Sequence, residues 1–116
     1  MTIHNDVPHF PAGIFVAEID GNKARTLRGF YPRIAKALFF PDYFGKNLDA
    51  LFDCLCSLEV VGSQEIVLLI RNAESFLLKE KKEKRDAAMD VLRDAEKTQN
   101  RSDGVKFKVV GVRGKM

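Results

Sequence analysis

Apolar residues occur along this chain in two kinds of pattern, short runs and helically spaced sets. The short runs lie at Gly13 to Ile19 and at Glu65 to Ile70, and a third segment, Val105 to Val112, alternates apolar residues with lysine. Segments of this length and composition predict β-strands. The unbroken Ile-Val-Leu-Leu-Ile content of the second predicts a central strand buried on both faces. The alternation in the third predicts an edge strand with one face in solvent.

Sets of apolar residues at helical spacing separate these strands. Between Ala24 and Leu38 they recur every three or four positions, and Pro32 falls inside the set, so the helix begins either at Ala24 or near Tyr31. The segment from Lys81 to Lys97 carries Ala, Val and Leu on one face and charge on the others, which is typical of a surface helix. A short helix or turn is expected at Glu74 to Leu78.

Strands that alternate with helices predict an α/β fold, in which a small three-stranded parallel sheet has helices packed on it. The chain of 116 residues is long enough to bury one core. The segment from Met1 to Pro11 holds two prolines and no periodicity. We therefore expect a loose N-terminal segment over residues 1–11 and a single domain over residues 12–116.

A further amphipathic helix, between the first helix and the central strand, has an acidic edge. Leu48, Leu51 and Leu55 share one stripe of this helix, whereas Asp49 and Asp53 lie four residues apart on a neighbouring stripe that faces solvent. Like charges at this spacing repel each other and so do not stabilise the helix. The chain offers no third metal ligand and no nucleophile with an adjacent base for an enzymatic use of the pair. The pair therefore predicts a surface that binds cationic groups.

Neighbouring residues on this helix have more than one interpretation. Asn47 is a candidate N-cap, and Asp49 in the first turn favours the positive end of the helix dipole, so both can serve the helix itself. Asp53, in the second turn, lies beyond easy reach of the free amides, so its carboxylate contributes less to the stability of the helix. Phe52 lies at the border of the apolar and acidic stripes, either as a core residue or as an aromatic platform beside the carboxylates.

The overall composition narrows the possible classes of protein. No apolar run approaches the roughly 20 residues of a membrane span, and no basic start precedes an apolar signal core. Cys54 and Cys56 lie two residues apart on a helix and point in different directions, so they do not bridge each other. His4 and His9 fall in the loose N-terminal segment and make no zinc site with these thiols. We therefore expect a cytoplasmic protein without metal, cofactor or membrane contact.

The run from Pro41 to Leu55, Pro-Asp-Tyr-Phe-Gly-Lys-Asn-Leu-Asp-Ala-Leu-Phe-Asp-Cys-Leu, resembles the signature of the barstar family, small intracellular protein inhibitors of a secreted bacterial ribonuclease. The resemblance implies a barstar-like fold, a protein that is not an enzyme, and a ribonuclease or related toxin nuclease as its protein partner. It also implies that the loop and helix from Tyr43 to Ser57 plug the active site of that ribonuclease. We expect the inhibitor to be a monomer when free.

The resemblance implies a role for each residue that matches the family's contact surface. Asp53 would imitate an RNA phosphate and pair with arginines or a histidine of the enzyme, and Asp49 would make a second charged contact. Tyr43 would lay its ring against the catalytic histidine, and Asn47 would cap the helix and line the surface. On the long helix, Asp94 matches a further acidic contact.

This sequence departs from the family's pattern at several positions. Phe52 stands where the family typically has Trp, which keeps an apolar platform but loses the indole donor. Cys56, Ser57 and Leu58 replace a Thr-Gly-Trp sequence, and Thr98 stands where the family has another acid. The net charge is +3 and the pI about 9.0, whereas barstar is strongly acidic. These departures leave open a barstar-like module whose partner is a different toxin nuclease.

Charge is unevenly distributed along the chain, which reconciles the positive balance with an acidic surface. From Asp42 to Glu59 the one cation, Lys46, stands against four acids, whereas the stretch from Lys23 to Lys36 holds no acid. The basic stretches allow a nucleic-acid-binding interpretation. However, two glutamates interrupt the run at Lys79 to Arg85, and opposite charges at helical spacing explain it. Since no nucleic-acid motif accompanies the charge, direct nucleic-acid binding is not expected.

Overall fold

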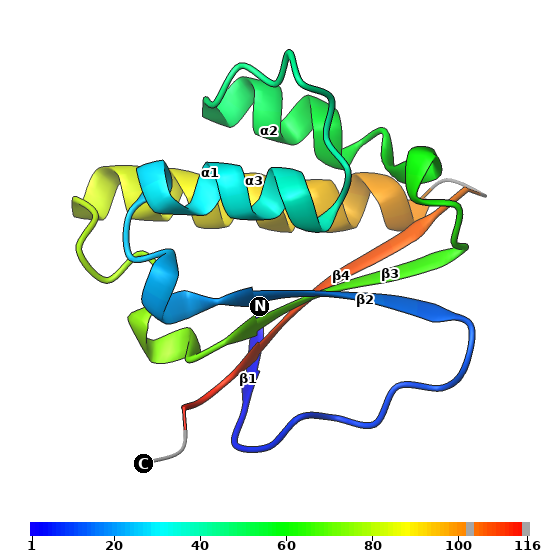
Figure 1. Cartoon of the computed structure of the whole chain (residues 1–116), viewed down its shortest axis with the longest axis horizontal. Coiled ribbons are helices and arrows are strands. Elements are labelled where there is room, and N and C mark those ends of the chain that lie inside the picture. The colour runs from blue at the N-terminus through cyan, green and yellow to red at the C-terminus, as the bar shows by residue number, and fades with distance from the viewer. Residues whose placement is uncertain (102–103, 115–116) are drawn as a thin grey trace.

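Four parallel strands and three helices make up the computed structural model, which describes residues 1–101 and 104–114. The sheet has the order β1-β4-β3-β2, with β1 (Thr2–His4), β2 (Ile14–Asp20), β3 (Glu65–Arg71) and β4 (Lys106–Val112). Three helices, α1 (Leu27–Ala37), α2 (Leu48–Leu55) and α3 (Lys82–Arg101), lie on one side of it (Figure 1). Short 3-10 helices occur at η1 (Gly21–Lys23), η2 (Leu58–Val61) and η3 (Ala73–Ser75).

The prediction of an α/β fold with a parallel sheet is confirmed, but the number of strands is four rather than three. The additional strand is β1, which pairs in parallel with Val110, Gly111 and Val112 of β4. It places Val110 to Val112 of β4 between two strands, so the prediction of β4 as an edge strand is wrong for that part of the strand. The segment before Gly13 therefore contains one short strand. Two of the three side chains of β1 are exposed, so a hydrophobic pattern could not reveal this strand.

The outer edge of β4 is covered in two different ways. Beyond the three residues that β1 pairs, side chains of α3 take the place of a strand. Glu96 Oε2 accepts a hydrogen bond from the amide of Val109 at 3.0 Å. Asn100 accepts from the amide of Phe107 at 3.3 Å and donates to its carbonyl at 3.2 Å. These contacts satisfy backbone groups that an uncovered sheet edge would leave to solvent or to another chain.

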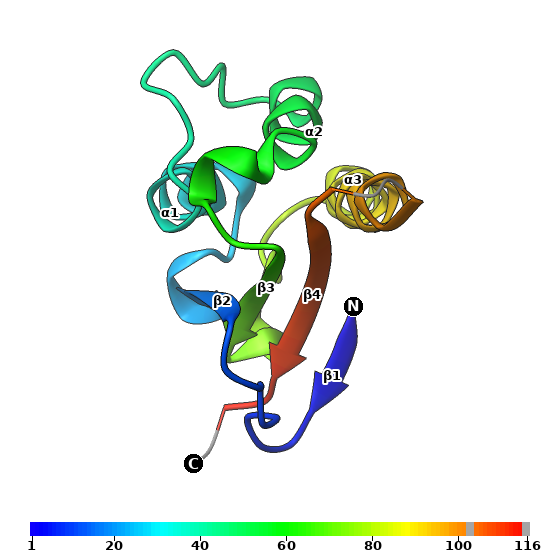
Figure 2. The same cartoon turned by 90° about the vertical axis from the view of Figure 1, so that its right-hand side faces the viewer.

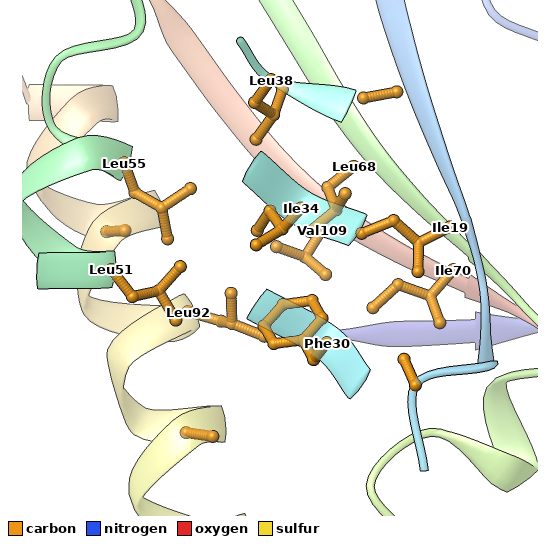
Figure 3. Packing of buried hydrophobic residues seen from close by; sticks show 14 of the residues in the cluster. Ile19, Phe30, Ile34, Leu38, Leu51, Leu55, Leu68, Ile70, Leu92 and Val109 are labelled. Atoms are coloured by element: carbon orange, nitrogen blue, oxygen red, sulfur yellow. The ribbon is translucent and has the colours of Figure 1, made fainter. Parts of the chain in front are cut away.

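The main core lies between the helices and the sheet, and a smaller one lies on the opposite face of the sheet. Figure 3 shows the main core, in which side chains from all three helices meet those of β2, β3 and β4: Phe30, Ile34, Leu38, Leu51, Leu55, Leu92, Ile19, Leu68, Ile70 and Val109. On the opposite face, Val67 and Leu69 of β3 pack with Val110 and Val112 of β4, beneath Phe10. The prediction that the central strand is buried on both faces is confirmed.

Helix α1 begins at Leu27, between the two starting points that the sequence left open. Thr26 caps it by accepting from the amide of Gly29 at 3.3 Å. Glu80, from a distant part of the chain, accepts from the amide of Leu27 at 2.9 Å. Pro32 lies inside the helix with its ring exposed. Pro32 has no amide hydrogen for the carbonyl of Arg28, so the helix lacks one internal hydrogen bond there, while the side-chain caps fix where the helix begins.

The edge contact made by Glu96 leads to a prediction about stability. Glu96→Ala leaves the amide of Val109 without its acceptor, so we expect the free energy of unfolding to fall by about 1–2 kcal/mol. Glu96→Gln keeps an oxygen at the same place and should lose much less. Urea unfolding of the two variants and the parent measures this difference. Equal losses in the two variants would mean that the charge of Glu96, rather than this hydrogen bond, matters.

Candidate functional site

The loop between α1 and α2 is held in place by one aromatic residue and presents the next one to solvent. Phe44 is buried, and its ring packs edge to face on Tyr31 at 5.8 Å and on Phe40 at 5.1 Å between ring centroids. Its amide also donates to the carbonyl of Pro41 at 3.0 Å. Tyr43, in contrast, is 87% exposed. The loop is therefore preformed, and Tyr43 projects from an anchored support.

Both ends of α2 are fixed by side-chain hydrogen bonds. Asn47 Oδ1 accepts from the amide of Ala50 at 2.8 Å, which confirms the predicted N-cap. At the other end, Gln99 of α3 donates to the carbonyl of Leu55 at 2.9 Å. Leu51 and Leu55 are fully buried in the main core. Figure 3 shows both on the side of the core where Leu92 of α3 also lies, across from Ile34 of α1. This burial determines which face of α2 remains outside.

Asp49 and Asp53 lie on that outer face, and both are exposed. The ion pairs among residues 1–101 and 104–114 join Arg71 to Glu18, Lys82 to Asp86 and Arg93 to Asp90, so neither carboxylate of α2 is neutralised there. Burial and, secondarily, the charge of Asp53 raise the pKa of the Cys54 thiol. Burial, Asp53 and Glu59 do the same for the pKa of Cys56. The thiols thus stay protonated at neutral pH, next to a site of negative potential.

A surface hollow of about 540 Å³ brings Tyr43 and Asp53 together. Its other lining residues come from the loop, from α2 and from the segment after it: Phe39, Phe40, Pro41, Cys54, Ser57 and Val60. Phe39 and Val60 are 56% and 65% exposed, so the hollow has an apolar rim around a single carboxylate. Sequence reasoning missed both residues. The signal available in the sequence was a large apolar side chain in a segment that lacks the periodicity of a buried helix or strand.

The remaining residues singled out from the sequence lie outside this hollow. Phe52 is half-buried and packs against the main core, which supports the first of its two interpretations. Asp49 is one turn before Asp53 on the same helix and does not line the hollow. Asp94 is exposed on α3, the helix that packs beside α2 (Figure 2). The site therefore has a compact part, made by the loop and α2, and a separate acidic residue on α3.

The arrangement offers a binding surface rather than a metal centre. No three His, Cys, Asp or Glu side chains come together in a way that could hold a metal ion, within the part of the chain that the structure describes. Among the same residues, no helix is both long and apolar enough to cross a membrane. What the surface provides is an exposed tyrosine, two exposed carboxylates and an apolar rim, all on segments fixed to the core.

Comparison with known proteins finds a family that matches most of the chain and a relative that matches part of it. A Bacillus subtilis protein, YrdF, whose name describes it as a candidate ribonuclease inhibitor, is 46% identical over 37 residues. That alignment covers 32% of this chain and 41% of YrdF, so the chain spans less than half of that relative. A sequence model of the family described as barstar (barnase inhibitor) matches residues 14–111. This match covers most of the chain and all three helices, and it shows that the chain belongs to the barstar family.

Proposed function

We propose that this protein inhibits a ribonuclease by filling the enzyme's cationic active-site cleft with the surface made by Tyr43, Asn47, Asp49, Phe52 and Asp53, with Asp94 as an outlying contact. The family is described by its inhibition of barnase, and the name of YrdF describes a candidate inhibitor of a ribonuclease. The observation that carries the proposal is the pair of exposed carboxylates on α2, which have no ion pair within the described residues.

Asp53 is the residue we assign to the centre of this interface. It lies in the hollow beside Tyr43, where a partner that covers the apolar rim also removes water from the carboxylate. A desolvated carboxylate is stable only when cations and hydrogen-bond donors surround it, so the surface favours a partner with a cluster of them. A ribonuclease that grips RNA phosphates has such a cluster in its active site.

The rigidity of the surface contributes to binding in its own right. Phe44 anchors the loop, Asn47 caps α2, and Gln99 holds its end. Because these contacts exist before a partner arrives, association does not have to order the loop or the helix, which lowers the entropy cost of binding. Within residues 1–101 and 104–114, the two acids of α2 also have no ion pair to give up.

We further propose that the protein acts in the cytoplasm, is a monomer when free, and works without catalysis, metal or cofactor. An inhibitor that occupies an active site needs no catalysis, metal or cofactor of its own. The enzyme is held in a complex, and its substrate is excluded as long as the complex lasts.

A second candidate partner is a toxin nuclease that differs from barnase in the shape of its cleft. The segment after α2 favours it. Leu58 is fully buried there, while Val60 is 65% exposed at the rim of the hollow. An apolar residue at this position extends the contact surface and requires a matching apolar patch on the partner.

Replacing Asp53 tests the proposed centre of the interface. Removal of one partner of a buried ion pair costs about 3–5 kcal/mol, so Asp53→Ala should weaken inhibition at least about 100-fold. Its thermal midpoint should stay near that of the parent, because Asp53 is exposed. The measurement is RNA cleavage by barnase, and by any nuclease that the parent captures, at increasing inhibitor concentration. Asp86→Ala, which removes an exposed acid of α3, is the matched control.

Two outcomes would separate the parts of this proposal. Full inhibition by Asp53→Ala would show that the site is elsewhere. If the parent itself does not inhibit barnase but does inhibit a captured nuclease, the second candidate partner is the correct one.

Adjacent aromatic residues of the loop should respond in opposite ways. Tyr43→Ala removes an exposed ring, so we expect inhibition to weaken by about 10-fold or more while stability is unchanged. Phe44→Ala empties a buried position and should lower the free energy of unfolding by about 3 kcal/mol. Inhibition titrations and urea unfolding, run on both variants, measure the two effects. A stability loss in Tyr43→Ala would contradict the separation of roles.

A further inference from the structure

Cations of this chain gather in two segments. Residues 23–36 and 79–86 together hold ten of the 19 Lys and Arg residues but only three of the 16 Asp and Glu residues. The rest of the chain has a net negative charge. The net charge of +3 therefore comes from these two segments.

The fold brings the two segments side by side. The amide of Leu77 donates to the carbonyl of Ala24 at 2.9 Å, and the amide of Lys79 donates to the carbonyl of Arg25 at 3.0 Å. Helices α1, α2 and α3 all begin at this end of the molecule, at the left of Figure 1. Helix N-termini carry partial positive charge, and the carboxyl ends of parallel strands are the usual place for ligands in α/β folds. Charge from side chains and from backbone thus accumulates at one end.

A hollow of about 630 Å³ opens at this basic end. Three cations line it, Arg28 of α1, Lys46 of the loop before α2, and Lys84 of α3. Pro32, which is exposed, and Leu48, which is half-buried, also line it. The hollow shares no lining residue with the one that holds Tyr43 and Asp53. It is therefore a second hollow with the opposite charge, and Asn47 of the proposed inhibitory surface lies at its border.

These three cations are not neutralised within the described residues. In the run from Lys79 to Asp86, the ion pair formed is Lys82 with Asp86, so the expected salt-bridged face is limited to one pair. Glu80 is the one acid that lines the hollow, and its carboxylate accepts from the amides of Leu27 and Lys81. A cationic surface without internal partners attracts anions from solution.

In contrast to the expectation from the sequence, the geometry points to a binding site for the phosphates of a single-stranded polynucleotide at this basic end. Phosphates recur along such a chain, so consecutive ones can contact Lys46, Arg28 and Lys84 around the hollow. A base beside them can cover the apolar side chains of Pro32 and Leu48. A run of acidic side chains alone would meet the cations but leave this apolar surface uncovered, which favours the polynucleotide.

Fluorescence anisotropy with a labelled uridine dodecamer and a labelled thymidine dodecamer, over a range of KCl concentrations, tests this site. We expect the double variant Lys46→Gln/Lys84→Gln to bind at least about fivefold more weakly at low salt. Its salt slope should fall by about 1.4, since each contact to a single strand contributes about 0.7. The matched control is Lys97→Gln/Lys108→Gln, two exposed lysines elsewhere, which should stay within about twofold of the parent.

Similar binding of both dodecamers would mean that the site reads phosphates, and tighter binding of the uridine one that it also reads ribose or base. No binding at low salt, or equal weakening in the two double variants, would overturn the proposal. Tighter binding of a glutamate dodecapeptide would overturn it in favour of an acidic protein. Asp53→Ala should leave binding unchanged, so the result does not depend on the proposed inhibition. A loss of binding in that variant would place the contact on α2 and also overturn the proposal.

Discussion

The burial of Leu51 and Leu55 in the main core is the constraint on which the candidate site depends. Both side chains are fully buried, and they force the opposite face of α2 into solvent. Asp49 and Asp53 lie on that face because the stripe of the helix that carries the leucines must face the core. Phe44 does the same for the preceding loop, since its burial turns Tyr43 outward. The candidate site is thus formed by the faces of α2 and of the loop that do not pack in the core. Substitutions in the core would therefore shift the site residues as well.

Much of the fold could be predicted from periodicity, and the parts that could not depend on contacts between distant residues. The strands β2, β3 and β4 and the helices follow from local patterns. Strand β1 does not, because backbone pairing with β4 defines it while its side chains are mostly exposed. The start of α1 depends on Glu80, more than fifty residues away. The edge of β4 is covered by Glu96 and Asn100, whose sequence pattern reads only as surface helix.

The candidate site shows the same division between local and distant causes. Helical spacing predicted the exposure of Asp49 and Asp53, and the N-cap geometry of Asn47 is confirmed. The hollow around Tyr43 and Asp53 could not be predicted, because Phe39 and Val60 reach it from two segments without regular periodicity. Sequence spacing also overestimated the pairing of charges near the start of α3. Opposite charges at helical spacing can pair, but long exposed side chains gain little by doing so.

Net charge is a poor guide to the partners of this protein, because its charges are separated in space. Lys46 lies before the N-cap of α2, and Asp53 lies six residues beyond that cap, Asn47, which corresponds to about 9 Å along the helix. The Debye length at physiological ionic strength is about 8 Å, so each group is largely screened from charges at that distance or farther. The molecule extends over 36 × 33 × 23 Å, several times this length. A partner in contact with α2 therefore meets the local field of the acids on that helix rather than the +3 of the whole chain. A basic protein can in this way present an acidic surface to a cationic cleft, with orientation at close range taking the place of long-range attraction.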